Sequence, residues 1–188
     1  MQIRELTVGP VGTCCYILSR EGAGECVVID PGDEASRIRE ACGSMRIAAL
    51  LLTHGHFDHI AAVSDLLQED TKLLIHALDA PLLSDPDRNV SRLFTGRAVT
   101  APPPTGFVKE GDVLALAGLE FTVFHTPGHT PGSVCYRVGD HFFTGDTLFD
   151  HGWGRTDLPG GDEHALFASL RRIMPLARTL SVHPGHAS

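Results

Sequence analysis

The sequence predicts a single domain of the α+β class that spans all 188 residues. Short apolar runs typical of strands recur along the chain, and segments with apolar residues at helical spacing lie between them. Glycine-rich turns follow several of these runs, and each of those turns carries a histidine or an aspartate. Because a chain of this length buries one core, we expect one domain with its functional residues at strand ends.

In the first half of the chain, about residues 1–100, strands and helices alternate. Strands are predicted at residues 2–6, 15–18, 26–29, 47–52 and 72–76, and the second and third form a hairpin across a glycine-rich turn. A helix capped by Asp33 runs to Cys42 and stops at Gly43. Further helices are expected at residues 60–69, with Ile60, Val63, Leu66 and Leu67 on one face, and at 77–83. Periodicity is lost from residue 85 to 106, and we expect a loop there.

The second half, about residues 107–188, begins after the proline-rich loop 100–106. Strands are predicted at 113–117, 120–125, 134–138, 141–144 and 179–182, and the third and fourth form a hairpin across Gly139-Asp140. A helix capped by Asp162 runs to about residue 173. Both halves contain strands, then a histidine cluster, then a helix, so we expect pseudo-symmetric halves within one domain.

Composition and charge limit the classes of partner. The chain is 43% hydrophobic and 20% charged, which is ordinary for a globular protein, and no apolar stretch approaches a membrane span. The net charge is −8 and no basic run occurs, so we expect neither a nucleic-acid nor a membrane partner. Residues 1–5 lack the apolar region of a signal peptide, and we expect a cytoplasmic protein. The oligomeric state stays open.

The cysteines predict neither a disulfide framework nor a cysteine zinc site. They are odd in number, scattered, and without C-x-x-C spacing: Cys14, Cys15, Cys26, Cys42 and Cys135. We expect them to be small buried apolar residues. The meaning of the adjacent pair Cys14-Cys15 stays open.

The stretch from Thr53 to His59 carries the strongest chemical signal. It follows the strand at 47–52 and holds four potential metal ligands within six residues: His54, His56, Asp58 and His59. Residues i and i+2 of an extended segment point to the same side, so two imidazoles converge beside a carboxylate. A histidine-rich surface turn is the ordinary alternative. Four such residues at a strand end favour a site for Zn, Mn or Fe, since Ca and Mg prefer oxygen ligands.

Three later turns repeat this arrangement of strand end, glycine and metal-ligand residue. They are Thr126-Pro127-Gly128-His129, Gly145-Asp146-Thr147 and Pro184-Gly185-His186. Ligands that are far apart in sequence can meet in this way at one edge of a sheet. The other histidines match no such position: His76, His125, His141, His151, His164 and His183. His183 is the one competitor of His186, which we prefer because Pro184-Gly185 provides the shared turn.

His54-x-His56-x-Asp58-His59 resembles the metal signature of the metallo-β-lactamase fold. The later turns match that family in type and order, and the run from Gly154 to Gly161 is similar to its glyoxalase II-like branch, the hydroxyacylglutathione hydrolase-like enzymes. The resemblance extends from about residue 8 to the end of the chain. It implies a four-layer αββα sandwich with metals in a cleft at the ends of two sheets. It also places the Asp30 turn at the cleft floor, where we expect Asp30 to support the ligands.

Carried over residue by residue, the resemblance implies two divalent metal ions per chain and no other cofactor. His54, His56 and His129 hold one ion, Asp58, His59 and His186 hold the other, and Asp146 bridges both. We expect zinc, with iron or manganese as alternatives. Two departures concern the second ion: Ala187 stands where the family has glycine, and the chain stops at Ser188. Chain ends fray, so weaker binding is expected there.

The activity that the resemblance implies is hydrolysis of small acyl thioesters by a metal-bridging hydroxide, which Asp58 and Asp146 orient. The expected substrate is a small-molecule thioester such as a glutathione conjugate; Arg155 is the arginine expected at its carboxylate, rather than the surface residues Arg88 and Arg92. One alternative is a persulfide dioxygenase-like enzyme with one iron held by His54, His129 and Asp146. Another is a metal-binding protein without thioesterase activity. Lactamase and nuclease activities rank behind these, since His59 replaces the arginine of many lactamases.

Overall fold

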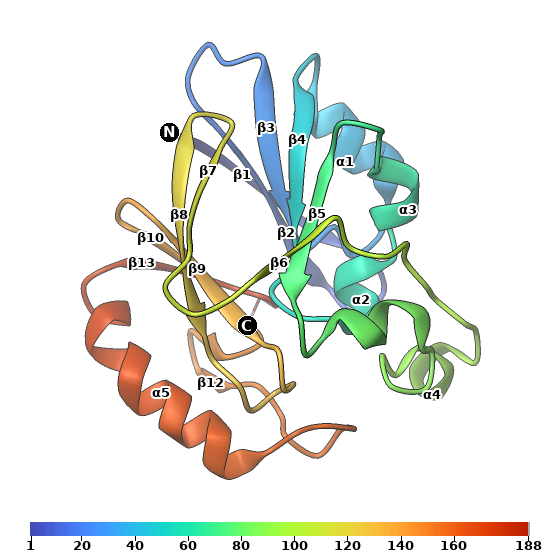
Figure 1. The fold of residues 1–188 in the computed structure, drawn as a ribbon, viewed down its shortest axis with the longest axis vertical. Helices are drawn as coiled ribbons and strands as arrows, with labels where there is room; N and C mark the ends of the chain where they lie inside the picture. The colour runs from blue at the N-terminus through green and yellow to red at the C-terminus, as the bar shows by residue number, and fades with distance from the viewer. Residues whose placement is uncertain (188) are drawn as a thin grey trace.

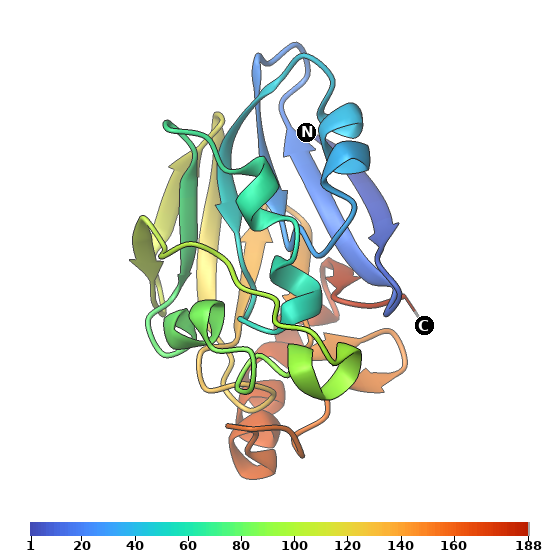
Figure 2. The same cartoon turned by 90° about the vertical axis from the view of Figure 1, so that its right-hand side faces the viewer.

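The computed structural model describes residues 1–187, and Figure 1 shows two sheets face to face, each covered by helices on its outer side. The sheet coloured blue to green carries α1, α2 and α3, and the sheet coloured yellow to red carries α5. The turned view in Figure 2 brings the helices on the outer side of the first sheet to the front. The α+β class and the four-layer αββα sandwich, both expected from the sequence, are confirmed.

The first sheet contains strands from the first half of the chain and one strand beyond it. In spatial order these are β1 (Gln2–Val8), β2 (Thr13–Ser19), β3 (Glu25–Ile29), β4 (Arg46–Leu51), β5 (Lys72–His76) and β6 (Gly106–Val108). The pairs β1–β2 and β2–β3 are antiparallel, which confirms the predicted hairpin and the predicted edge strand. The pairs β3–β4, β4–β5 and β5–β6 are parallel. The strand ends of β3, β4 and β5 therefore meet at one edge.

The second sheet has the spatial order β13 (Ser181–Pro184), β10 (His141–Gly145), β9 (Val134–Val138), β8 (Leu119–His125) and β7 (Val113–Leu116). Its strands are antiparallel except for the parallel pair β10–β13. A separate short hairpin, which the sequence did not predict, joins β11 (Leu148–Phe149) to β12 (Gly152–Trp153).

Three buried apolar clusters fill the spaces between the four layers. One lies between the helices α1–α3 and the first sheet, one lies between the two sheets, and one lies beneath α5. Alternation along β2 explains the division: Cys15 and Ile17 join the first cluster, whereas Tyr16 and Leu18 join the cluster between the sheets. Both faces of this strand are covered, so its residues are continuously apolar.

The helices differ from prediction in their bounds. They are α1 (Ala35–Cys42), α2 (Phe57–Ile60), α3 (Val63–Leu66), the 3-10 helix η1 (Ala80–Ser84), α4 (Ser91–Thr95) and α5 (Glu163–Ala177). Gly43 ends α1 as predicted, but Asp33 is not its N-cap: Glu34 occupies that position with a left-handed backbone, and Asp33 Oδ1 accepts from the Glu34 N–H. Asp162 caps α5 as predicted, accepting from the Ala165 N–H at 3.0 Å.

The helix predicted at residues 60–69 is wrong as one continuous element. The N–H of Ala62 donates to the carbonyl of Pro31 at 3.0 Å, which interrupts the helical bonding between α2 and α3. Gly32 approaches the Asp58 carbonyl so closely that a Cβ there would lie 1.8 Å from its oxygen. The turn after β3 thus lies against the helix that carries Asp58, and the Pro31 carbonyl accepts the N–H that a continuous helix would have bonded to the Asp58 carbonyl.

Three other differences have local causes. The α4 helix lies within the region that was expected to be a loop, and β6 begins at the last residue of that region, Gly106; α4 is one short turn held between the left-handed residues Val90 and Gly96. The α5 helix continues past Pro175 to Ala177, because Ile173 and Ala177 are buried beneath the second sheet. The short helix expected at 77–83 is shifted and of the 3-10 type.

All five cysteines are buried and free of disulfide bonds, which confirms the prediction of small buried apolar residues. Within residues 1–187, no helix combines the length and apolar character needed to span a membrane.

Candidate metal centre

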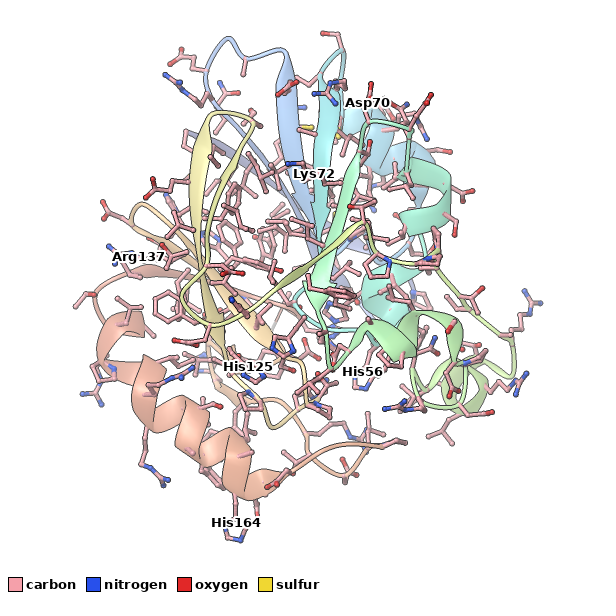
Figure 3. The ribbon with its side chains drawn as sticks, viewed as in Figure 1. His56, Asp70, Lys72, His125, Arg137 and His164 are labelled. Carbon is pink, nitrogen blue, oxygen red and sulfur yellow. The ribbon has the colours of Figure 1, made fainter. Side chains whose placement is uncertain are left out.

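The structure brings all seven predicted ligand residues together at one edge of the sandwich. His54 and His56 follow β4, while Asp58 and His59 lie on α2. The other three come from the second half of the chain, at the loop between β8 and β9, the end of β10 and the end of β13: His129, Asp146 and His186. In Figure 3, His56 lies beyond the ends of the strands, whereas His164 projects away from α5 and Arg137 lies on the outer side of the second sheet.

The first group, which we call the imidazole set, consists of His54, His56 and His129. Their candidate ligand atoms lie within 4.8 Å of one another, and all three side chains are buried. His56 Nδ1 is 2.9 Å from His129 Nε2, and the ring of His54 is centred 4.8 Å from each of the other two rings.

The second group, which we call the carboxylate set, consists of Asp58, His59 and His186. Its candidate ligand atoms also lie within 4.8 Å of one another. Asp58 Oδ2 is 3.5 Å from His59 Nε2 and 3.3 Å from His186 Nε2. The hydroxyl of Thr13 donates to the same carboxylate oxygen at 2.9 Å and so fixes its orientation.

Asp146 stands between the two sets. One of its oxygens is 3.4 Å from His129 Nε2 of the imidazole set and 3.4 Å from His186 Nε2 of the carboxylate set. The other oxygen is 3.5 Å from His59 Nε2. This single carboxylate therefore reaches both candidate metal positions.

Unpartnered buried atoms test whether these residues fit metal ions. Among residues 1–187, His54 Nε2, His56 Nε2 and Asp146 Oδ1 are buried side-chain atoms without a hydrogen-bond partner. Buried polar atoms are normally satisfied, because leaving them unpaired costs free energy. Nitrogen and carboxylate donors that converge in this way suit a divalent transition metal, and the residues fit the group that the fold family implies.

Hydrogen bonds behind the ligands set which ring nitrogens face the site. The Nδ1–H of His129 donates to the Arg155 carbonyl at 2.7 Å, which leaves Nε2 with a free electron pair. His59 Nδ1 lies 2.9 Å from Asp30 Oδ2, and His54 Nδ1 lies 3.1 Å from the Thr53 hydroxyl. For these three histidines Nε2 is the atom available to a metal.

Asp30 supports the carboxylate set from behind, as the sequence led us to expect. Besides contacting His59, it accepts hydrogen bonds from the N–H and the hydroxyl of Thr53, at 2.8 and 2.6 Å. Its backbone is held in the left-handed region, with φ of 50°. A non-glycine residue adopts this conformation only where its surroundings impose it, and here the buried hydrogen bonds do so.

Asp79 supports the imidazole set, and sequence reasoning missed it. It is fully buried after β5, and it accepts from the N–H of Gly55 at 2.9 Å and from the hydroxyl of Thr130 at 2.7 Å. It also accepts from the N–H of Gly132 at 2.7 Å, where a Cβ would lie 2.6 Å from the carboxylate. Asp79 thus ties the His54–His56 turn to the His129 loop. Its position just after a predicted strand was the available signal.

The two sets differ in their proton affinity. Burial lowers the pKa of His54 well below its usual value, and burial together with nearby His129 lowers the pKa of His56 to about 3. These two histidines of the imidazole set are therefore neutral at pH 7, which is the form that binds metal.

In the carboxylate set, charge outweighs burial. Burial alone lowers the pKa of His59, but Asp58 and Asp30 raise it to about 9. Burial also lowers the pKa of His186, but its neighbours Asp146 and Asp58 raise that pKa to about 10. Burial alone raises the pKa of both carboxyls, yet the imidazoles hold Asp58 at about 2 and Asp146 well below its usual value. Two imidazolium ions thus balance the carboxylates when no metal does.

His186 is held by the first sheet, although it lies two residues from the chain end. Thr13 and His186 form a bridge between strands, and the Cys14 N–H donates to the Gly185 carbonyl at 2.8 Å. The hydroxyl of Tyr16 donates to the Pro184 carbonyl at 2.7 Å. Three residues of β2, namely Thr13, Cys14 and Tyr16, therefore position the last ligand.

The remaining histidines lie outside the cluster, as expected. His76 and His125 stack on each other with ring centres 4.1 Å apart, and His141 Nδ1 lies 2.9 Å from His183 Nε2. His183 thus pairs away from the site and does not compete with His186. His151 and His164 are exposed.

A cavity of about 150 Å³ opens onto the two sets, and we call it the inner chamber. Its lining joins the ligands to apolar side chains and one arginine: Val11, Phe57, Val90, Phe94, Leu158 and Arg155. Phe57 and Phe94 stack with ring centres 6.2 Å apart. The guanidinium of Arg155 is already paired with Asp157 through two contacts of 2.6 and 2.7 Å. Arg88 and Arg92 are exposed and do not line this cavity.

Comparison with known proteins agrees with this geometry. The family profile of the Metallo-beta-lactamase superfamily matches residues 8–186. Hydroxyacylglutathione hydrolase GloC of Haemophilus influenzae is 35% identical over 176 residues, which cover 86% of this chain and 79% of that protein.

Two solved structures are similar over nearly the whole chain. The crystal structure of BLEG-1, described as a B3 metallo-beta-lactamase, has a TM-score of 0.92 and 37% identity, covering 100% of this chain and 92% of that one. That of TTHA1623 in a di-iron-bound form has a TM-score of 0.86 and 39% identity, with 98% and 92% covered.

The sandwich and the histidine–aspartate cluster at its edge define a metal-dependent hydrolase of a fold that binds divalent metals. Its family follows from the profile match over almost the full length. The chain belongs to the metallo-β-lactamase superfamily, as the resemblance of His54-x-His56-x-Asp58-His59 indicated.

Proposed function

We propose that the protein hydrolyses small acyl thioesters of the hydroxyacylglutathione type, with two metal ions per chain. The observation that carries the proposal is the position of Asp146, one carboxylate within 3.5 Å of imidazoles from both ligand sets. The name of the GloC relative supports the substrate class. We expect zinc in both positions; iron is the alternative that the di-iron form of TTHA1623 supports.

Metal ions in these sets supply Lewis acidity and lower the pKa of a coordinated water towards about 7. The protein supplies the rest. Asp58 and Asp146 are ionised at pH 7, so each can accept a hydrogen bond from the attacking water and orient it. The Thr13 hydroxyl keeps Asp58 turned toward the site.

The inner chamber and the leaving group explain why no further acid is needed. Phe57, Phe94 and Leu158 give the chamber apolar walls beside the ligand sets. A thiol has a pKa of about 8.5, so the thiolate leaves without protonation by a dedicated side chain. The absence of another acid–base pair among the residues lining this chamber is consistent with thioester chemistry.

The direct test combines metal analysis with activity on S-lactoylglutathione. The purified protein is expected to hold two metal ions per chain and to hydrolyse this thioester. Asp146→Asn should abolish hydrolysis, whereas His151→Ala, a change at an exposed histidine outside the cluster, should not.

Parallel assays separate the other activities. One iron per chain with oxygen consumption on glutathione persulfide would favour the dioxygenase-like alternative, and metal binding without hydrolysis would favour a non-catalytic metal protein. Hydrolysis of a β-lactam such as nitrocefin, but not of the thioester, would favour lactamase activity, which the similarity to BLEG-1 keeps as a second candidate.

A further inference from the structure

A second cavity adjoins the inner chamber, and we call it the outer chamber. It has a volume of about 200 Å³. The two cavities share Val11, Phe57 and Asp58 in their linings. The two cavities are therefore neighbours that meet beside the carboxylate set, at Asp58.

The outer chamber combines apolar walls with two groups of opposite charge. Val8, Pro10 and Val99 contribute apolar surface, and Asp33 and Arg97 provide a carboxylate and a guanidinium. No ion pair within 4.0 Å joins these two residues, and none joins either of them to another part of residues 1–187. Asp33 uses Oδ1 to accept from the Glu34 N–H at 2.6 Å, and its Oδ2 has no such partner in the same range.

Two other arginines near these cavities, in contrast, already have an ion-pair partner. Arg155, in the inner chamber, is neutralised by Asp157, and Arg92 on α4 is paired with Asp87 at 2.9 Å. In a chain with a net charge of −8, an unpaired guanidinium beside an apolar cavity attracts an anionic ligand group. The unpaired carboxylate in the same cavity adds a place for a cation.

We infer that the outer chamber binds an α-amino-acid zwitterion of the substrate, with its carboxylate on Arg97 and its ammonium group on Asp33. The inference rests on the proposed function, because a thioester at the metal centre directs its remote end into this chamber. The γ-glutamyl end of glutathione carries such a free amino and carboxylate pair, whereas its glycine end carries a carboxylate alone. The structure therefore favours entry of the γ-glutamyl end.

Calorimetric binding of S-methylglutathione, a thioether that cannot be hydrolysed, tests this without any need for turnover. Acetylating the γ-glutamyl amine should weaken binding to the wild type about tenfold, or about 1.4 kcal/mol. Asp33→Asn, which keeps an oxygen for the Glu34 N–H, should remove that difference. Likewise, converting the γ-glutamyl α-carboxylate to an amide should weaken binding to the wild type about tenfold but leave binding to Arg97→Ala unchanged.

Arg88→Ala is the matched control, since Arg88 is exposed in the same segment and lines neither chamber; it should behave as the wild type. Three results would overturn the inference: no binding of S-methylglutathione, equal binding of capped and uncapped ligands, or a dependence on Arg97 that follows only the glycine carboxylate. If the protein shows the expected binding pattern but hydrolyses no thioester, the proposed reaction is wrong, whereas the inferred binding of the amino and carboxylate groups in the outer chamber is supported.

Discussion

The two ligand sets lie side by side, yet they differ in the charge state of their donor groups before metal binds. The imidazole set has no carboxylate of its own, and its His54 and His56 are neutral before any metal arrives because burial disfavours their charged forms. The carboxylate set is charged, with His59 and His186 balancing Asp58 and Asp146. A metal entering the first set displaces few protons, whereas a metal entering the second must displace two.

The supports behind the sets differ in the same way. Asp79 holds the imidazole set through backbone N–H groups of its loops, so its effect is on loop position. Asp30 holds the carboxylate set by direct contact with His59, so its effect includes the charge of a ligand. The imidazole set is therefore positioned mainly by the geometry of its loops, whereas the carboxylate set also depends on electrostatic interactions.

The largest expected effect comes from the one residue that both sets share. Asp146→Asn removes a negative charge between them and should lower thioester turnover more than the roughly 10- to 100-fold typical of residues behind the ligands. Metal content by elemental analysis and kcat on S-lactoylglutathione measure the effect. Normal metal content with normal turnover would contradict the bridging role.

His186→Ala should affect metal binding at the carboxylate set but not at the imidazole set. We expect it to reduce metal content from two ions per chain to one, because the imidazole set keeps all its donors. His129→Ala should instead empty the imidazole set. Equal loss of both ions in both variants, with the fold intact by circular dichroism, would show that the two positions are not independent.

Asp79→Asn should weaken the imidazole set while leaving the carboxylate set less affected. An amide cannot accept all three of the hydrogen bonds from Gly55, Thr130 and Gly132, so metal affinity should fall about 10- to 100-fold. Competition with a chelator of known affinity measures it. Asp70→Asn, at an exposed aspartate, is the control. A loss confined to the second ion would refute this assignment.

The smallest effect is on stability as a function of pH. In the metal-free protein, His59 and His186 have pKa values raised from 6.5 to about 9 and about 10. Their contribution is complete below pH 6.5 and is lost as the pH rises through those values. The melting temperature of chelated protein should therefore fall between pH 7 and 10.

The metal-loaded protein provides the comparison for that measurement. Its imidazoles are already deprotonated, so the alkaline decrease should be absent. At acidic pH the metal-loaded protein should instead become less stable as the pH falls, because protons compete with the metal for His59 and His186. Identical pH profiles with and without metal would show that these imidazolium ions do not stabilise the fold.

Three of the seven candidate ligands, His129, Asp146 and His186, are predictable from sequence because they obey one local rule. A strand ends, glycine allows a turn, and a histidine or aspartate follows, as at Gly128-His129 and Gly145-Asp146. The strands themselves are predicted well, since burial on both faces makes β2, β3 and β4 almost continuously apolar.

The elements that sequence reasoning missed depend on distant partners. The break between α2 and α3 arises from the Pro31 carbonyl, which no helical periodicity reveals. Asp79 resembles any aspartate in a turn until the Thr130–Gly132 loop, 51 to 53 positions away, is placed against it. Asp33 illustrates the reverse: it was expected to cap a helix, and its carboxylate instead lines a cavity.

The bridge between Thr13 and His186 has a consequence for biosynthesis. Contacts of such sequence separation are slow to form, because nearly the whole chain must be ordered before they close. During translation, the three donors of the imidazole set have all been added once residue 129 is in place, whereas the carboxylate set waits for residue 186. The second candidate metal position therefore cannot form before residue 186 has been added.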